Sequence, residues 1–244
     1  MRAVILAAGQ ATRLRPLTDD CPKCLLEVGG ETMLARAVRL LAARGLRRFT
    51  VVDGFRGDLI RAALAAGFPG LDFTFVRNED YASTNNAWSL MLADCRGDEP
   101  ILLLDSDIVC EAGVYDAVLA PGAPNRLGLR TQGDLGDEEM KVRLDARGLV
   151  AALTKRMPPA EAAGESVGLE VFAGDFVAAL RGVLHRRLRV EGRVNEYYEE
   201  AFTELAGAGH AIAVVDLGPL RCLEIDTAAD LESARRAFAA GEIA

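Results

Sequence analysis

The sequence is poor in the residues on which several common functions depend. With two histidines in 244 residues, no Ser-His-Asp set is evident. Five cysteines, an odd number spread along the chain, imply no disulfide framework and fit a reducing cytoplasm. No apolar run approaches the ~18 residues of a membrane span, so no membrane partner is expected. A formal net charge of −8 lacks the basic excess of general nucleic-acid-binding proteins, and local basic clusters in so acidic a chain favour a small anionic ligand.

The first half of the chain alternates short apolar runs with amphipathic segments. The spacing of the apolar residues, together with the turn residues between them, predicts strands at 2–7, 49–52, 71–76 and 101–109, and helices at 32–44, 58–66 and 86–94. This alternation predicts the α/β class, with a Rossmann-like three-layer α/β/α arrangement around a mostly parallel sheet.

The second half changes pattern. Three strands at 127–131, 140–145 and 149–153 predict a small antiparallel excursion, followed by helices at 176–188 and 197–206 and strands at 211–216 and 222–225. Thr227 and Asp230 have capping-box spacing at the start of a last helix. Because no linker or repeat interrupts the chain, we expect one domain over 1–244.

The segment ILAAGQATRLRPLTDDCPKCLLEVGG, residues 5–30, follows the first predicted strand. It matches neither G-x-G-x-x-G nor G-x-x-x-x-G-K-[ST], so basic side chains would have to supply the charge that holds a phosphate. Arg13 suits bidentate phosphate binding and Lys23 suits a point-charge contact. A solvated surface loop explains the same charges equally well from this segment alone.

Two acids, Asp105 and Asp107, end the predicted strand 101–109, and a third, Asp226, precedes the last helix. Residues two apart on a strand share a face, and ligands bind at the carboxyl ends of strands in open α/β sheets. Asp105 and Asp107 therefore predict a Mg²⁺ site, with a helix cap or a turn as the alternative, whereas Asp226 taken by itself fits the start of a helix cap.

The order of the residues resembles a known family. Leu6-Ala7-Ala8-Gly9, Thr12-Arg13-Leu14, Pro16-Leu17-Thr18, Pro22-Lys23 and Leu25-Leu26 stand in register with L-A-A-G-x-G-[ST]-R-L-x-P-L-T-x(4)-P-K-x-L-L, the opening of the nucleotidyltransferases that activate sugar phosphates and related phosphomonoesters. Ala11 replaces the second loop glycine, which puts the local backbone conformation in question. The resemblance implies catalytic roles for Arg13 and Lys23 and metal ligation by Asp107 and Asp226, leaving Asp105 in the nucleotide site.

Residues 76–93, VRNEDYASTNNAWSLMLA, resemble the cytidylyltransferase branch, which includes enzymes for phosphocholine, inositol phosphate and 2-aminoethylphosphonate. A polar helix start explains the asparagines alone. The resemblance implies a nucleotide site formed by Leu6, Ala7, Ala8, Gly9, Gln10, Asn78, Thr84, Asn85, Ser89 and Asp105. It also implies a site for the acceptor, the small phosphorylated or phosphonate compound that receives the nucleotidyl group, formed by Lys141, Lys155, Glu165, Glu170 and Tyr197. The nucleotide-binding part of the domain would then lie at about 1–110 and the acceptor-binding part at about 111–226.

The reaction so implied is Mg²⁺-dependent transfer of CMP from CTP to a small phosphonate or phosphomonoester, with release of pyrophosphate. The acceptor is 2-aminoethylphosphonate, a polyol phosphate or phosphocholine, and aromatics at 6% of the chain weigh slightly against a quaternary ammonium. The alternatives are a sugar-1-phosphate uridylyl- or thymidylyltransferase, a metal-dependent glycosyltransferase using the D-S-D motif, and a regulatory relative without turnover. Neither a nucleic acid nor a membrane is an expected partner, and a homodimer is left open.

Overall fold

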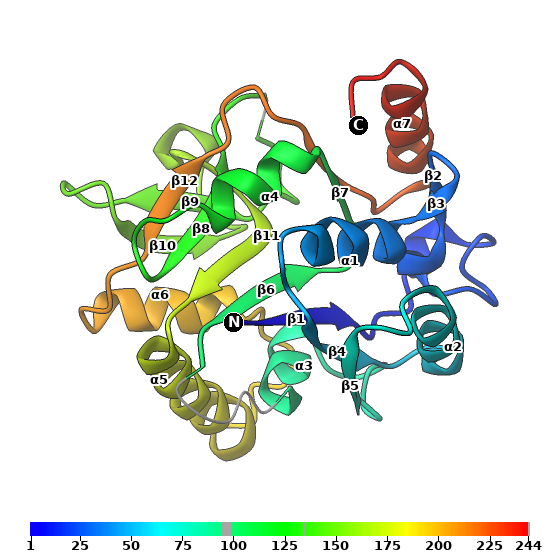
Figure 1. The fold of residues 1–244 in the computed structure, drawn as a ribbon. Helices are drawn as coiled ribbons and strands as arrows, with labels where there is room; N and C mark the ends of the chain where they lie inside the picture. The colour runs from blue at the N-terminus through cyan, green and yellow to red at the C-terminus, as the bar shows by residue number, and fades with distance from the viewer. Residues whose placement is uncertain (94–98, 134, 244) are drawn as a thin grey trace.

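A single mixed sheet runs through the protein in the computed structural model, which describes residues 1–93, 99–133 and 135–243 (Figure 1). Its strand order is β10-β9-β11-β6-β1-β4-β5, and β8 pairs with both β11 and β12. The parallel half contains β1 (Arg2–Ala7), β4 (Arg48–Asp53), β5 (Asp72–Arg77) and β6 (Ile101–Asp105). The fold-class prediction is confirmed.

The remaining strands of the sheet pair in antiparallel fashion, except β12, which runs parallel to β8. They are β8 (Arg126–Arg130), β9 (Lys141–Leu144), β10 (Val150–Thr154), β11 (Gly164–Phe172) and β12 (Ala213–Asp216). Strand β11 runs antiparallel to β6 and so joins the two halves of the sheet. The sequence pattern does not predict β11, because its acids, serine and glycines interrupt the apolar pattern by which strands are recognised.

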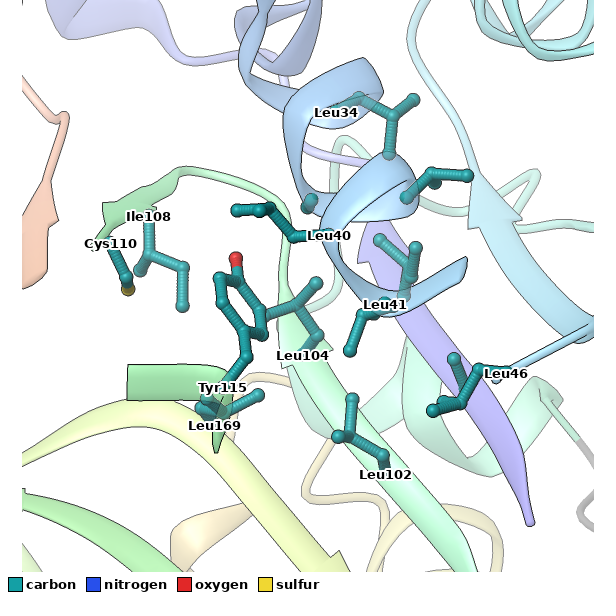
Figure 2. Close-up of a cluster of buried hydrophobic side chains, with 14 of the residues drawn as sticks. Leu34, Leu40, Leu41, Leu46, Leu102, Leu104, Ile108, Cys110, Tyr115 and Leu169 are labelled. Carbon is teal, nitrogen blue, oxygen red and sulfur yellow. The ribbon is translucent and has the colours of Figure 1, made fainter. Parts of the chain in front are cut away.

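Helices cover both faces of the sheet (Figure 1). One core packs beneath α1 (Met33–Ala43), α2 (Gly57–Gly67) and α4 (Ala112–Leu119), and the other beneath α3 (Asn86–Leu92), α5 (Gly174–His185) and α6 (Glu199–Gly207). Alternation along β1 divides Ile5 from Leu6, which enter opposite cores. Figure 2 shows Leu40 and Leu41 of α1 packed near Leu102 and Leu104 of β6.

A third, smaller core lies under the C-terminal helix α7 (Ala228–Ala239), which packs on the hairpin of β2 (Glu27–Val28) and β3 (Glu31–Thr32) (Figure 1). The predicted capping box is confirmed: Asp230 N–H donates to the Thr227 hydroxyl, and the Asp230 carboxylate accepts from Thr227 N–H. Short 3₁₀ turns occupy Thr12–Leu14, Lys23–Leu25 and Pro159–Glu161, and a π-helical turn, Arg186–Val190, follows α5.

Two expectations need correction here. The run 101–109 is not one strand, because a turn at Ser106 and Asp107 separates β6 from β7 (Ile108–Cys110), which pairs with β13 (Cys222–Glu224) in a separate sheet. That pairing sets Cys110 opposite Cys222, and the structure joins them in a disulfide, although the odd and scattered cysteines implied no disulfide framework. The two cysteines are 112 residues apart, and only the β7–β13 pairing brings them together. The odd fifth cysteine, Cys95, and the end of the predicted helix 86–94 lie outside the described residues.

Candidate active site

A cleft of about 280 Å³ opens at the carboxyl ends of the parallel strands β1 and β6. Strand β1 leads into the small residues of the first loop, and β6 ends at Asp105. The predicted nucleotide-site residues that line this cleft are Leu6, Ala7, Ala8, Gly9, Asn78, Thr84, Asn85, Ser89 and Asp105. Gln10 is not among the described residues that line it. Segments far apart in sequence therefore meet where an open α/β sheet holds its ligand.

The first loop turns sharply at Ala11. This residue has φ 48° and ψ 52°, the left-handed conformation that glycine adopts without steric cost. The Thr18 hydroxyl donates to the Ala11 carbonyl at 2.8 Å and helps to hold the turn. The Ala11 substitution therefore leaves the loop in the conformation that a glycine would favour, at the cost of local strain.

Two cations of the first loop meet one carboxylate. Lys23 Nζ lies 2.7 Å from Asp226 Oδ1 and 2.9 Å from Asp107 Oδ2, and Arg13 Nη2 lies 2.6 Å from Asp226 Oδ2. Burial by itself would lower the pKa of Lys23, but the two carboxylates raise it above its ordinary value, so the side chain stays an ammonium. Arg13 is half exposed and also pairs with Glu138 at 3.4 Å. The loop thus presents guanidinium and ammonium groups to the cleft.

Three carboxylates gather beside Lys23. Oxygen atoms of Asp107, Glu224 and Asp226 lie within 4.8 Å of one another. Desolvation of the Glu224 carboxyl group, together with the charges of Asp107 and Asp226, raises its pKa to about 8, although the residue as a whole is exposed. Burial would also raise the pKa of Asp226, but Lys23 and Arg13 hold it below its ordinary value. An all-oxygen set with an excess of negative charge has the donor chemistry that Mg²⁺ or Ca²⁺ takes, so these residues fit a divalent cation.

Hydrogen bonds among residues 78–89 hold the polar wall of the cleft in place. Asn78 is buried, and its amide donates to Thr84 Oγ1 at 3.2 Å and Ser89 Oγ at 3.1 Å while accepting from Asp80 N–H at 2.9 Å. Asn85 caps α3 by accepting from Asn86 N–H, as the helix-start alternative predicts. Asn78 therefore positions the polar wall of the cleft, and its described bonds occupy both ends of its amide.

The structure separates the residues predicted for the acceptor. Lys155 and Tyr197 line the cleft, with Lys155 Nζ 5.1 Å from the centre of the Tyr197 ring. Lys141 is 1% exposed and donates to the Lys155 carbonyl at 2.8 Å, so burial removes it from contact with a ligand. Glu165 lines a neighbouring cavity and is ion-paired with Arg130. Glu170 is fully buried and accepts from the Ser166 hydroxyl.

Residues outside the predicted nucleotide and acceptor sites complete this end of the cleft. Tyr198 donates to Asp105 Oδ2 at 2.8 Å, and Asn86 accepts from Tyr198 N–H at 3.0 Å. Gly168 has φ 70°, and a Cβ there would lie 2.7 Å from Asp105 Oδ2, so this position admits no side chain. Glu199, the first residue of α6, lines the same region. The packing of α6 decides that, of its first two residues, Glu199 is the acid that is buried.

The cleft thus lies at the carboxyl ends of parallel strands, with the cations of the first loop facing an acid cluster. Residues 3–134, more than half of the chain, match the MobA-like NTP transferase domain, and the chain belongs to that family. Among the described residues, none of the helices has the length and apolar character needed to cross a bilayer.

The relatives confirm the expected resemblance to the cytidylyltransferase branch. The chain is 31% identical over 246 residues to CMP-5'-(3-aminopropyl)phosphonate synthase of Streptomyces rubellomurinus, matching 96% of this chain but only 38% of that longer protein. It is 26% identical to the 2-aminoethylphosphonate cytidylyltransferase of Lancefieldella rimae, covering 95% of this chain and 88% of the relative.

Solved structures share the fold. CTP:phosphocholine cytidylyltransferase from Streptococcus pneumoniae superposes with a TM-score of 0.77 at 18% identity, covering 97% of this chain and 98% of that one. The inositol-1-phosphate CTP transferase of T. maritima has the same TM-score at 22% identity, with 96% of each chain covered.

Proposed function

We propose that this protein transfers CMP from CTP to a small phosphonate or phosphomonoester acceptor and releases pyrophosphate. The observation that carries the proposal is the meeting of Arg13 and Lys23 with Asp107 and Asp226 at the mouth of a polar cleft. Similarity over 95% or more of this chain to two proteins named for CMP-phosphonate chemistry supports the choice of nucleotide and acceptor.

The reaction is an in-line substitution at the α-phosphorus of the nucleotide. An acceptor oxygen forms a bond to that phosphorus while the bond to the β-phosphate oxygen breaks, and the electron pair leaves with pyrophosphate. Arg13 and Lys23 neutralise charge on the triphosphate, and Lys155 draws the acceptor's anionic group into the cleft. Because both substrates are anions, bringing them together requires such cations.

Asp107, Asp226 and Glu224 would hold a Mg²⁺ ion. When bound, the ion supplies Lewis-acid neutralisation of phosphate charge and helps to orient the substrates. Lys23 bonds to two of the same carboxylates in this structure, so the lysine and a cation compete for the same oxygens.

A sugar-1-phosphate uridylyltransferase is the second candidate. It is supported by 32% identity to UTP--glucose-1-phosphate uridylyltransferase of Haloferax volcanii. That match covers 48% of this chain, whereas the matches to the phosphonate proteins extend through the acceptor-binding half. The wider coverage favours CTP and a phosphonate.

The test is pyrophosphate release with Mg²⁺. CTP, UTP, ATP, GTP and dTTP are each paired with 2-aminoethylphosphonate, phosphocholine, inositol phosphate and glucose-1-phosphate. Release with CTP and a phosphonate or phosphomonoester is the expected result. Release with UTP or dTTP and the sugar phosphate would transfer the chain to the second candidate. Absence of pyrophosphate, with free nucleoside diphosphate formed from a nucleotide sugar, would identify a glycosyltransferase.

A further inference from the structure

A small cavity of about 70 Å³, distinct from the one lined by Glu165, adjoins the cleft, and it shares with the cleft lining residues that include Lys155 and Tyr197. Its wall is strongly acidic. The carboxyl groups that line it belong to Asp105, Asp107, Glu138, Glu199 and Glu224, and Lys155 is the one basic residue of its described lining. Such a wall repels the phosphate end of a substrate and attracts a cation.

Most of these acids already have partners. Asp107 bonds to Lys23, Asp105 accepts from Tyr198, and Glu138 lies at the exposed rim within ion-pairing distance of Arg13 and Lys155. Glu224 belongs to the candidate metal set. The acid that remains for a ligand is Glu199.

Glu199 is 5% exposed, and its Oε2 has no hydrogen-bond partner among the described residues. The Asn86 side chain bonds to the same carboxyl group. A buried carboxylate oxygen without a partner costs free energy, because it has lost its water and gained no donor. The arrangement persists because α6 and the Tyr198 hydrogen bonds fix the start of the helix.

We propose that Glu199 is the specificity residue for a primary ammonium group at the end of the acceptor remote from its phosphonate. The inference rests on the proposed function and narrows its acceptor to an aminoalkylphosphonate or aminoalkyl phosphate. The ammonium donates to Glu199 Oε2 inside the acidic cavity, and Lys155, at the junction of the two cavities, holds the anionic end. A zwitterionic acceptor thus contacts Glu199 with its ammonium group and Lys155 with its anionic end.

The chemistry of the cavity distinguishes a primary ammonium from the other acceptors. A quaternary ammonium donates no hydrogen bond and needs an aromatic cage, and Tyr197 is the one aromatic residue in the described lining. A polyol offers hydroxyl groups but no positive charge to set against the acids. A primary ammonium supplies three donors and a full charge.

Groups around Glu199 set its ionisation. Burial, the largest cause, raises the pKa of Glu199 to about 7. The hydrogen bond from the backbone N–H of Glu199 itself, the charge of Lys155 and the hydrogen bond from Asn86 oppose that shift, whereas the charge of Glu200 adds to it. Asp105 and Glu170, from β6 and β11, also lie within electrostatic range. An arriving ammonium adds the counter-charge that this acidic surrounding lacks.

The experiment compares 2-aminoethylphosphonate with propylphosphonate, which has a methyl group in place of the ammonium. Initial rates with CTP and Mg²⁺ give kcat/KM for each acceptor in the wild type and in Glu199→Gln. The wild type should favour the amine by about ten- to a hundredfold, the value of a charge-assisted hydrogen bond, and the variant by less than about threefold. The loss should appear mainly in KM for the amine.

Glu200→Gln is the matched control. It removes the same charge one residue along α6, where the side chain is 45% exposed and near Arg187, and it should keep the wild-type preference. Thermal unfolding checks that Glu199→Gln folds. Equal preference for the two acceptors in the wild type, or an unchanged preference in Glu199→Gln, would overturn the proposal.

Calorimetry separates this inference from the proposed function. Titration of both acceptors into both proteins, with CTP and Mg²⁺ left out, measures the ammonium contribution without turnover. Tighter binding of the amine that is lost in Glu199→Gln supports the inference even if no pyrophosphate is formed, in which case only the proposed reaction fails. Equal binding of the two acceptors by the wild type refutes the inference whatever the reaction.

Discussion

Replacing Lys23 with methionine should have opposite effects on metal binding and on turnover. The substitution keeps most of the apolar stem and removes the ammonium that lies 2.9 Å from Asp107 and 2.7 Å from Asp226. The two carboxylates then lose their cation, and a divalent ion no longer has to displace it. The reacting phosphates lose the same cation.

The expected size of each effect follows from these contacts. A hydrogen bond between charged groups is worth about 1.5–3 kcal/mol. Because an ammonium displaced by the metal regains water, we count only one of its two bonds. Freeing the carboxylates should therefore tighten Mg²⁺ binding by about ten- to a hundredfold. Loss of one preorganised cation should lower kcat by about 10²–10³-fold. Without metal the variant should lose about 2 kcal/mol of stability, less than a fully buried pair, because about a quarter of each carboxylate faces solvent.

Three measurements check this prediction: pyrophosphate release for kcat, calorimetry with Mg²⁺ for affinity, and thermal unfolding with and without the ion. Lys141→Met is the matched control, because Lys141 is also buried but bonds to main-chain carbonyls outside the cleft. The control should lose stability without a change in metal affinity. Wild-type turnover in Lys23→Met, or weaker Mg²⁺ binding, would refute the reasoning.

Three further predictions follow from the same geometry. Asp107→Asn should reduce turnover below detection and weaken Mg²⁺ binding in calorimetry, since a charged ligand is replaced by a neutral one; a variant that keeps its rate would remove Asp107 from the metal set. Ala11→Gly should raise the unfolding free energy by about 1 kcal/mol in urea denaturation, because the left-handed backbone strain is relieved, and a loss of stability would contradict that account. Glu199→Gln should have a higher free energy of unfolding than the wild type at about pH 8, by up to about 3 kcal/mol, and no difference below about pH 4.5, as measured by thermal unfolding at each pH. The sign follows because burial raises the pKa of Glu199 to about 7, so ionisation penalises the folded wild type only as pH rises, and a pH-independent difference would refute it.

The sequence by itself determined the parts of this protein that local pattern encodes. Alternation and helical period located β1, α1 and α7, and the capping box at Thr227 needs only residues three apart. The ordered motif around Arg13 and Lys23 indicated the family before any fold was known, because its residues are close in sequence. Local order is enough wherever neighbours in the chain are also neighbours in space.

Only the tertiary structure decided which distant side chains meet. The pairing of β7 with β13 brings Glu224 and Asp226 to Asp107, and it also joins Cys110 to Cys222. Packing of α6 buries Glu199 without a partner, whereas the β9–β10 pairing buries Lys141 against the chain. Charge alone cannot separate a ligand-binding acid from a solvated one or a catalytic lysine from a structural one, because that difference lies in burial and partners, which the folded chain creates.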